Sequence, residues 1–343
     1  MSYTSETVLP PKATLVQVQD LVALLGYKKA NDDLKVPNRI AGYFWYDETD
    51  YRSFVGVELD IYRNRDGIIT VTTRSRVGRS HWDLTQQNKT LKMFRDLLGG
   101  HFTTDAGRNR YWRPDEPAPT PLSSGCFLAR WRFHNGLGRA HVYLMSRKLE
   151  GQIAKDTPSG FDFMDEFNPR LLSNNFLLPY MVAVWEEYFR ATFAACLKYS
   201  PQREAALKRA RLSHGDLEKV AIGSQPIERA VAESFSFQRP SAITDNFRML
   251  DQKLDVGGAM RKPYRRRKTN LFDSIEQLVE DRNEFVHTGG MNLKFFDAQL
   301  NAALSDMQVA VNRAYECIAA HYHFVPSKRS LDEAKRNPGY STW

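Results

Sequence analysis

The sequence is poor in cysteine and contains no long apolar run. Its three cysteines, Cys126, Cys196 and Cys317, lie far apart and form neither a CxxC pair nor a metal-ligand spacing. An odd number of dispersed cysteines argues against a disulfide framework and favours buried thiols in a reducing compartment. No stretch approaches the ~18 apolar residues of a membrane span, and the N-terminus lacks the pattern of a signal peptide. We therefore expect a soluble cytoplasmic protein with no membrane partner.

Several familiar catalytic signatures are also missing. No P-loop, GxGxxG or nucleotidyltransferase pattern occurs, and the acidic run 57–63 (VELDIYR) lacks the Glu-x-Lys of a metal-dependent nuclease core. The histidines of the first half are scattered, with no acid or cysteine at ligand spacing. His321 and His323 would point apart on a helix, because residues two apart do not share a face. The sequence thus predicts neither a metal nor a cofactor.

Basic residues outnumber acidic ones. The formal net charge is +8, while 42% of residues are hydrophobic and 26% are charged, as in an ordinary globular protein. Residues 1–150 contain 22 Lys and Arg against 16 Asp and Glu, so most of the excess lies there. Two local basic runs span 74–81 and 107–113, and in the second the arginines neighbour Tyr111 and Trp112, which suits phosphates and bases. A solvated basic surface is the alternative.

Residues 1–150 predict an α+β domain with an antiparallel sheet. Two β-rich runs flank Asp66-Gly67 within 53–76, and this pattern predicts a hairpin. Two further runs flank Asn135-Gly136 within 126–146 and predict a second hairpin. The helices expected in this domain span 13–26 and 83–98.

The remainder of the chain predicts an all-α domain. Residues 151–171 are polar and rich in turn residues, so we expect a linker there. Almost nothing alternates with period two in 172–325, which favours a helical bundle. The polar tail 326–343 is expected to be loose. Asp273 and Glu276 predict a capping box at the start of one helix. The helices expected in this domain span 174–199, 202–212, 216–235, 269–287 and 294–324.

An arginine interrupts the apolar stripe of the 269–287 helix. The apolar positions of that helix, spaced by three, four and seven residues, are Ile275, Leu278, Val279, Phe285 and Val286. Arg282 lies four residues from two of them, in the middle of the stripe. An unpaired buried guanidinium is very costly. Arg282 therefore needs either a buried acid, such as Glu186 or Glu187, or an opening such as a cleft or a second subunit.

Two further polar residues accompany Arg282. His287 closes the helix just before Gly289-Gly290, and Asn283 lies four residues earlier, where its amide can orient the imidazole. Arginine can hold a phosphate through two hydrogen bonds, and histidine can move a proton to or from a ribose hydroxyl. This combination suits phosphodiester cleavage without a metal. The alternative is that His287 only stabilises the helix C-terminus, where a cation is favoured.

The string 282–287, Arg-Asn-x-x-x-His, resembles the signature of the HEPN superfamily. Residues 183–193 (AVWEEYFRATF) resemble the first long helix of that family, and residues 236–247 (SFQRPSAITDNF) resemble a segment that precedes its motif helix. The resemblance covers about 172–325, less than half of the chain. It implies a HEPN-like helical bundle that dimerises, with the motif helices of two protomers facing each other across a cleft.

The resemblance also implies an enzyme, a metal-independent HEPN endoribonuclease. In such enzymes the ribose 2′-hydroxyl attacks the adjacent phosphate and leaves a 2′,3′-cyclic phosphate and a 5′-hydroxyl. His287 would be the general acid and base, Arg282 would stabilise charge on the phosphate, and Asn283 would orient His287 or contact the phosphate. The implied partners are RNA, a second copy and, as for family toxins and antiviral effectors, a regulatory protein or phage-derived trigger. The alternative is a non-catalytic module for dimerisation and for RNA or nucleotide binding.

The densest basic run, RKPYRRRK, lies directly before the motif helix. Its position predicts contacts with an RNA backbone beside the cleft, with an affinity that falls as salt rises. A solvated basic loop is the alternative. The RNA-binding residues expected from this run are Arg261, Lys262, Arg265, Arg266, Arg267 and Lys268.

Overall fold

The computed structural model divides the chain into two compact units, Met1–Ser124 and Gly125–Trp343. The residues that it describes are 2–31, 36–114, 117–149, 156–200 and 202–326. Residues 151–155 of the predicted linker and residues 327–343 of the predicted tail lie outside the described residues. Among the helices of the described ranges, none is long and apolar enough to cross a bilayer.

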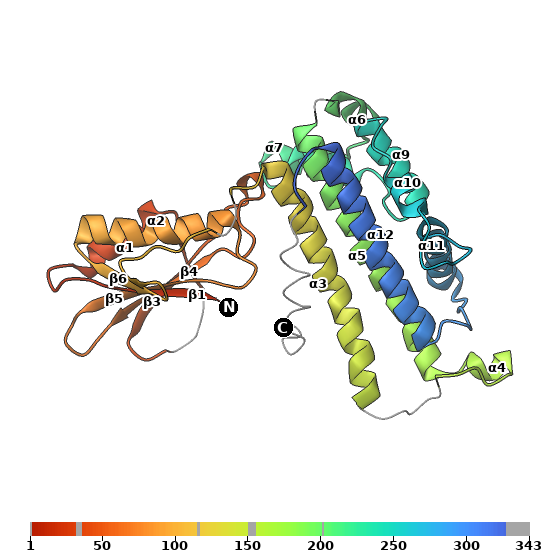
Figure 1. Ribbon diagram of the computed structural model, residues 1–343, viewed down its shortest axis with the longest axis horizontal. Coiled ribbons are helices and arrows are strands. Elements are labelled where there is room, and N and C mark those ends of the chain that lie inside the picture. The colour runs from red at the N-terminus through yellow and green to blue at the C-terminus, as the bar shows by residue number, and fades with distance from the viewer. Residues whose placement is uncertain (1, 32–35, 115–116, 150–155, 201, 327–343) are drawn as a thin grey trace. The chain divides into compact units, whose positions relative to one another are not determined.

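The first unit is an antiparallel sheet with helices on one face (Figure 1). Its strands are β1 (Tyr3–Val8), β2 (Lys28–Lys29), β3 (Arg39–Trp45), β4 (Val57–Arg63), β5 (Ile69–Ser75), β6 (His101–Thr104) and β7 (Gly107–Arg108). Its helices are α1 (Leu15–Leu24), the 3-10 helix η1 (Thr49–Tyr51) and α2 (His81–Leu98). The strand order is β2-β3-β4-β5-β1-β6-β7. The predicted hairpin at 53–76 is confirmed as β4 and β5.

Apolar residues at alternate positions of the strands form part of the core of this unit. Val57, Leu59 and Ile61 of β4 are buried in one cluster with residues of α1, because alternate strand residues face the same side. The predicted α+β character with an antiparallel sheet is confirmed. The sequence does not reveal the interior strand β1, because its buried side chains Ser5 and Thr7 are polar.

The second unit is helical. Its helices are α3 (Pro121–Leu149), α4 (Asp162–Asp165), α5 (Pro169–Tyr199), α6 (Arg203–Arg209), α7 (His214–Ala221), α8 (Ile227–Glu233), α9 (Pro240–Leu250), α10 (Val256–Arg261), α11 (Leu271–Thr288) and α12 (Asp297–His321). Helices α3, α5 and α12 lie side by side, and α9, α10 and α11 are grouped beyond them (Figure 1). The five helices expected after residue 172 are confirmed, with the stretch 216–235 divided between α7 and α8.

The predicted hairpin at 126–146 is wrong, because this segment is part of α3. Buried positions recur at helical spacing along it: Cys126, Arg130, Phe133, Leu137, Ala140 and Leu144. Gly136 marks a close helix contact rather than a turn, since a Cβ there would lie 2.7 Å from Val184 Cγ1 of α5. Because α3 packs with the helical unit, the units divide between Ser124 and Gly125 rather than at 151–171.

Candidate functional site

Helix α11 carries the candidate site on its second half. Its first half is anchored in the core through Ile275, Leu278 and Val279, which are buried. The predicted stripe does not stay buried beyond that point, since Val286 is 48% exposed and His287 is exposed. The last turns of α11 therefore rise out of the core, so the polar residues there are accessible from one side.

The predicted capping box of α11 is wrong. The helix begins two residues earlier than Asp273, and the N-cap is Asn270, whose side chain accepts from the backbone N–H of Asp273 at 2.9 Å. Glu276 instead reaches α9, where it accepts from the backbone N–H of Ser241 at 2.8 Å. Both Asn and Asp are good N-caps, so the sequence pattern could not separate the two starts.

Arg282 has no carboxylate partner in the described part of the chain. Its Nη1 donates to Asn283 Oδ1 at 2.8 Å, and its Nε is buried without an acceptor among the described residues. The acids proposed as its partners are engaged elsewhere, since Glu186 pairs with Arg190 and Glu187 with Arg229. The alternative of a pair with Glu186 or Glu187 is therefore wrong, and a half-buried cation is left for an external anion.

His287 stands alone on the last turn of α11. It is exposed and makes no hydrogen bond or ion pair within the described ranges. The expected orienting contact from Asn283 is not formed, because the amide oxygen of Asn283 accepts from Arg282 instead. Residues five apart on a helix point about 140° apart, whereas residues four apart differ by about 40°. Arg282 and His287 thus project from one helix in different directions.

A hydrogen-bonded chain ties the motif turns to the bundle. Asp281 accepts from Gln277 Nε2 at 2.8 Å and from Asn292 Nδ2 at 2.7 Å. Asn292, in the α11–α12 connection, also donates its backbone N–H to Asn175 Oδ1 of α5 at 2.9 Å. The sequence did not single out these residues, because they carry no motif and because Asn175 is 117 residues from Asn292 in the chain. They fix the register of α11 directly before Arg282.

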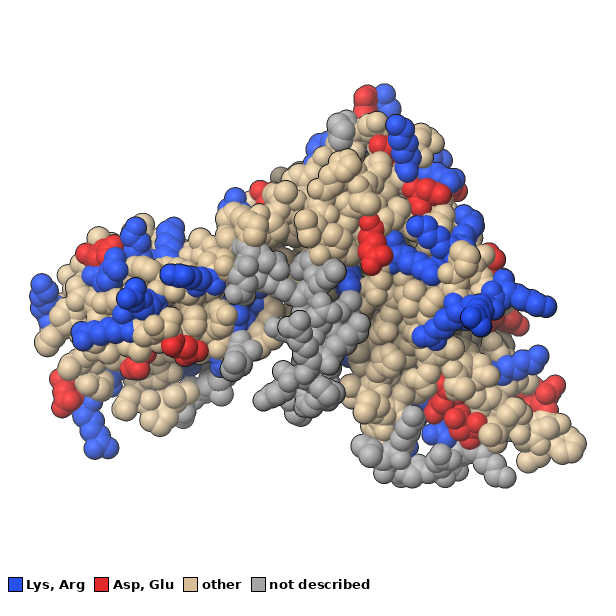
Figure 2. Space-filling view, viewed as in Figure 1, with Lys and Arg blue, Asp and Glu red and all other residues tan. Residues whose placement is uncertain are grey.

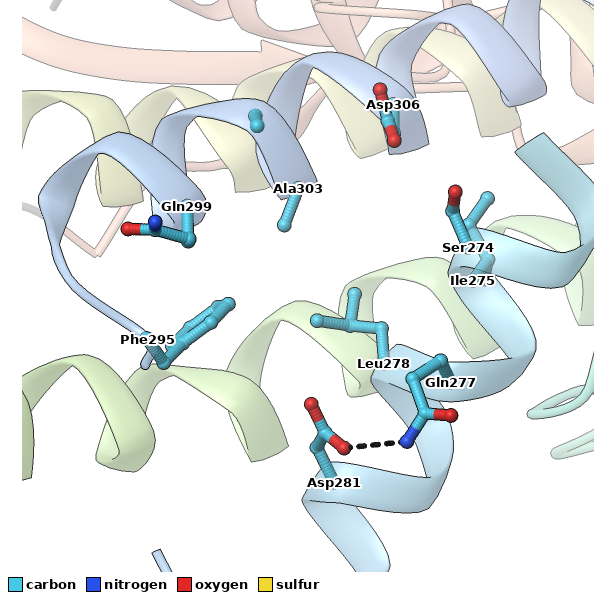
Figure 3. A pocket seen from close by; sticks show the side chains of 10 residues that line it. Ser274, Ile275, Gln277, Leu278, Asp281, Phe295, Gln299, Ala303 and Asp306 are labelled. Carbon is cyan, nitrogen blue, oxygen red and sulfur yellow. Dashed lines mark hydrogen bonds between the residues drawn. The ribbon is translucent and has the colours of Figure 1, made fainter. Parts of the chain in front are cut away.

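A cavity of about 210 Å³ lies between α11 and α12 (Figure 3). Asp281 lies near one end, where the figure shows its bond from Gln277, and Asp306 lies at the other end. Ile275, Leu278 and Phe295 supply apolar walls. Arg282, Asn283 and His287 do not line this cavity. The candidate site is therefore not part of this cavity.

Exposed apolar side chains border the motif turns. Phe176 of α5 is 62% exposed, and its ring meets that of Phe285 edge to face at 5.2 Å. Leu172, one turn before Phe176, and Val286 are exposed as well. We call Leu172, Phe176, Phe285 and Val286 the motif-side apolar patch. Phe285 is half-buried under the exposed Phe176 ring, and exposed apolar side chains beside polar residues can mark an interaction site.

The basic run occupies the opposite end of α11 from the motif. Figure 2 shows Lys and Arg side chains gathered where α10 and α11 lie. Three of the six expected RNA-binding residues have partners within the protein, and one of them, Arg265, lies over the Tyr264 ring. Arg261 lies 3.5 Å over the Phe272 ring, and Arg267 forms two hydrogen bonds with Asp306, at 2.8 and 2.9 Å. The run therefore does not adjoin the motif within one protomer, because most of α11 separates them.

Besides Arg261 and Arg267, four residues of the run are exposed and have no acidic partner in the part of the chain that the structure describes. They are Lys262, Arg265, Arg266 and Lys268.

The described residues bring no three His, Cys, Asp or Glu side chains together as a metal site would. No protein-family model, curated protein or solved structure matches this chain.

Proposed function

We propose that this protein is a metal-independent endoribonuclease of HEPN type that acts as a dimer. The observation that carries the proposal is the state of Arg282, a half-buried guanidinium without a carboxylate within the described residues, next to Asn283 and on the same helix end as exposed His287. A cation held in this way is suited to a phosphate. By resemblance, we further propose a role as a cytoplasmic toxin or antiviral effector.

The proposed reaction is a transesterification within RNA. A base removes the proton of the ribose 2′-hydroxyl, the 2′-oxygen forms a bond to phosphorus, and the bond from phosphorus to the 5′-oxygen breaks. An acid donates a proton to the departing 5′-oxygen. Imidazole suits both steps, and His287 fills this role. Arg282 stabilises the negative charge that grows on the phosphate, and Asn283 holds the guanidinium in place through its amide oxygen.

Two features of the helical unit support a dimer. Arg282 and His287 project about 140° apart on one helix, so a second α11 facing the first would help to surround one phosphate and would supply a second imidazole. The motif-side apolar patch lies next to the motif turns and includes Phe176, which is 62% exposed. A second copy would bury this patch and place two motifs together.

A second candidate function is RNA binding without cleavage. It is favoured by the absence of an orienting hydrogen bond to His287 among the described residues, since Asn283 is engaged by Arg282. A general acid works best when a neighbour fixes its orientation. In this case Arg282 would still bind phosphate, but the imidazole would not be held for proton transfer.

The test is cleavage of single-stranded RNA in the presence of EDTA by the wild-type full chain and three variants. We expect the wild type to cut, and we expect His287→Ala and Arg282→Ala each to lower the rate by at least ~100-fold, as loss of a proton-transfer group or a charge-stabilising group does. Arg282→Lys serves as the matched variant that keeps the charge but loses the two-pronged geometry.

The outcomes separate the two candidates. Cleavage that persists in both alanine variants, or that stops when EDTA is added to the wild type, contradicts the proposed mechanism. RNA binding that depends on Arg282 without any cleavage supports the binding module instead.

A further inference from the structure

We infer that residues 262–268, the basic loop, form a preorganised anchor for the backbone of single-stranded RNA that is separate from the motif. The substrate must then be long enough to reach both. This inference rests on the proposed function for the cleavage step, but the binding step stands independently of it. It also assigns different roles to the residues of the basic run.

The loop is held to α12 by contacts within the protein. Arg313 Nη1 donates to the backbone oxygen of Lys262 at 2.6 Å, and its Nη2 donates to that of Pro263 at 2.9 Å. Asp306 lies on the same helix as Arg313, and its carboxylate accepts two hydrogen bonds from Arg267. Two α12 side chains therefore fix the loop at both of its ends. An ordered loop loses less conformational entropy on binding than a flexible one.

The backbone of the loop supports the same interpretation. Arg265 and Arg266 have positive φ values of 51° and 53°. Non-glycine residues adopt this left-handed region rarely and at a cost in energy. Strain of this kind tends to occur where function requires a particular geometry. Here it lies at the two central cations, which are exposed.

The loop presents charge rather than an aromatic surface. Guanidinium groups of Arg265, Arg267 and Arg313 surround the Tyr264 ring, at 4.9, 4.9 and 5.5 Å from its centre. The ring is thus already occupied by cations, so the loop offers no free platform for a nucleobase. Contacts to phosphates alone give binding that depends on salt and little on base sequence.

Helix α11 sets the distance between the anchor and the motif. At about 1.5 Å per residue, Arg282 lies about 16 Å and His287 about 24 Å along the helix from Leu271. A stacked strand advances about 3.4 Å per nucleotide and covers this distance in about five to seven nucleotides. Shorter RNA can occupy the motif or the anchor, but not both. We therefore expect cleavage efficiency to rise with length across this range.

The first experiment measures binding without cleavage. Fluorescence anisotropy of the full-length His287→Ala variant is recorded with single-stranded RNA of about twelve nucleotides over a range of salt. Arg265→Asn with Arg266→Asn removes two cations, and asparagine tolerates the left-handed backbone. We expect the double variant to bind at least about tenfold more weakly and its log–log salt slope to be shallower by about 1.4, from about 0.7 per phosphate contact.

The matched control removes the same charge from another surface of this unit. Arg132 and Arg139 of α3 are exposed and have no acidic partner within the described residues. Arg132→Gln with Arg139→Gln should leave both the affinity and the salt slope unchanged. Equal losses in the two double variants would show that only net charge matters and would overturn the anchor.

The second experiment measures cleavage against RNA length with His287 intact. Loss of the loop cations should raise KM for RNA of about twelve nucleotides and leave kcat/KM for RNA of about four nucleotides unchanged. Equal effects on both lengths would overturn the spanning claim. If no RNA is cut but the double loop variant still loses affinity and salt slope, the proposed ribonuclease fails while the anchor stands.

Discussion

At the scale of single residues, His134 makes the stability of the helical unit depend on pH. Burial and the neighbouring Arg130 guanidinium lower the pKa of His134 from its ordinary 6.5 to about 4, and a contact with Asn312 offsets this only in part. The imidazole of His134 is therefore protonated below about pH 6.5 in the unfolded chain, but only below about pH 4 in the folded chain. The contribution of neutral His134 to the free energy of unfolding is complete above pH 6.5, the unfolded pKa. It is lost as the pH falls from 6.5 towards the folded pKa of about 4.

The change that tests this is His134→Gln, which cannot titrate. Between pH 7 and pH 5 the wild type should lose about 2 kcal/mol more of its free energy of unfolding than the variant does. Urea unfolding at both pH values, followed by the far-ultraviolet dichroism of the helices, measures the difference. The same pH dependence in both proteins would show that His134 is not the group responsible.

The sequence locates Arg282 but not its surroundings. Its place in an apolar stripe can be counted along the chain, and that count alone marks it as unusual. Its contacts depend on which helices pack against α11, and no local pattern contains that information. The chain offered Glu186 and Glu187 as acids of the right type, yet both pair with other arginines in the folded unit. Asn283 likewise contacts the guanidinium rather than the imidazole.

At the scale of elements, two glycines of α3 allow a paired test of helix packing. Gly136→Ala places a Cβ 2.7 Å from Val184 Cγ1 of α5, whereas Gly138 has nothing within 4 Å of the same added atom. We expect Gly136→Ala to destabilise the unit by roughly 1–3 kcal/mol, because overpacking outweighs the gain in helix propensity. Gly138→Ala should stabilise it by about 0.5–1 kcal/mol.

Thermal unfolding of the two variants distinguishes a helix contact from a turn at this site. If both substitutions stabilise the protein, then α3 does not approach α5 at Gly136. If both destabilise it, the glycines serve some backbone need that the helical geometry does not explain.

Most elements follow from the sequence, and α3 shows why one did not. Periodic apolar residues predict α5, α11 and α12, and most of the predicted ends of these helices lie within a few residues of the observed ends. The prediction succeeds because each of these helices buries one apolar face. In α3 the dipeptide Asn135-Gly136 imitates a hairpin turn, and buried Arg130 breaks the apolar pattern. The short strands β6 and β7 are not predicted from the sequence, since four or two residues are too few for alternation to show.

At the scale of the whole molecule, the proposal requires two copies. Phe176→Asp introduces a charge into the motif-side apolar patch at a side chain that is 62% exposed, so the fold of the single chain should survive. We expect the wild type to have twice the chain mass in light scattering and the variant to have the mass of one chain. The rate of RNA cleavage should also be lower in the monomeric variant, because one α11 does not direct Arg282 and His287 to the same point.

A matched control replaces an exposed apolar residue of the other unit. Leu24 of α1 is 74% exposed in the first unit, and Leu24→Asp should leave both the mass and the activity as in the wild type. A wild-type protein that remains monomeric at micromolar concentration, but cuts RNA at full rate, would show that the site is complete in one chain.

The most direct test of the central claim is the chemistry of the new RNA ends. Mass spectrometry of fragments produced by the wild type in EDTA should find a 2′,3′-cyclic phosphate on one side of each cut and a 5′-hydroxyl on the other. An RNA with 2′-deoxyribose at the cut position should remain intact, because the attacking hydroxyl is missing. Fragments that end in a 3′-hydroxyl and a 5′-phosphate, or cleavage of the deoxy substrate, would contradict attack by the 2′-hydroxyl and with it the role proposed for Arg282 and His287.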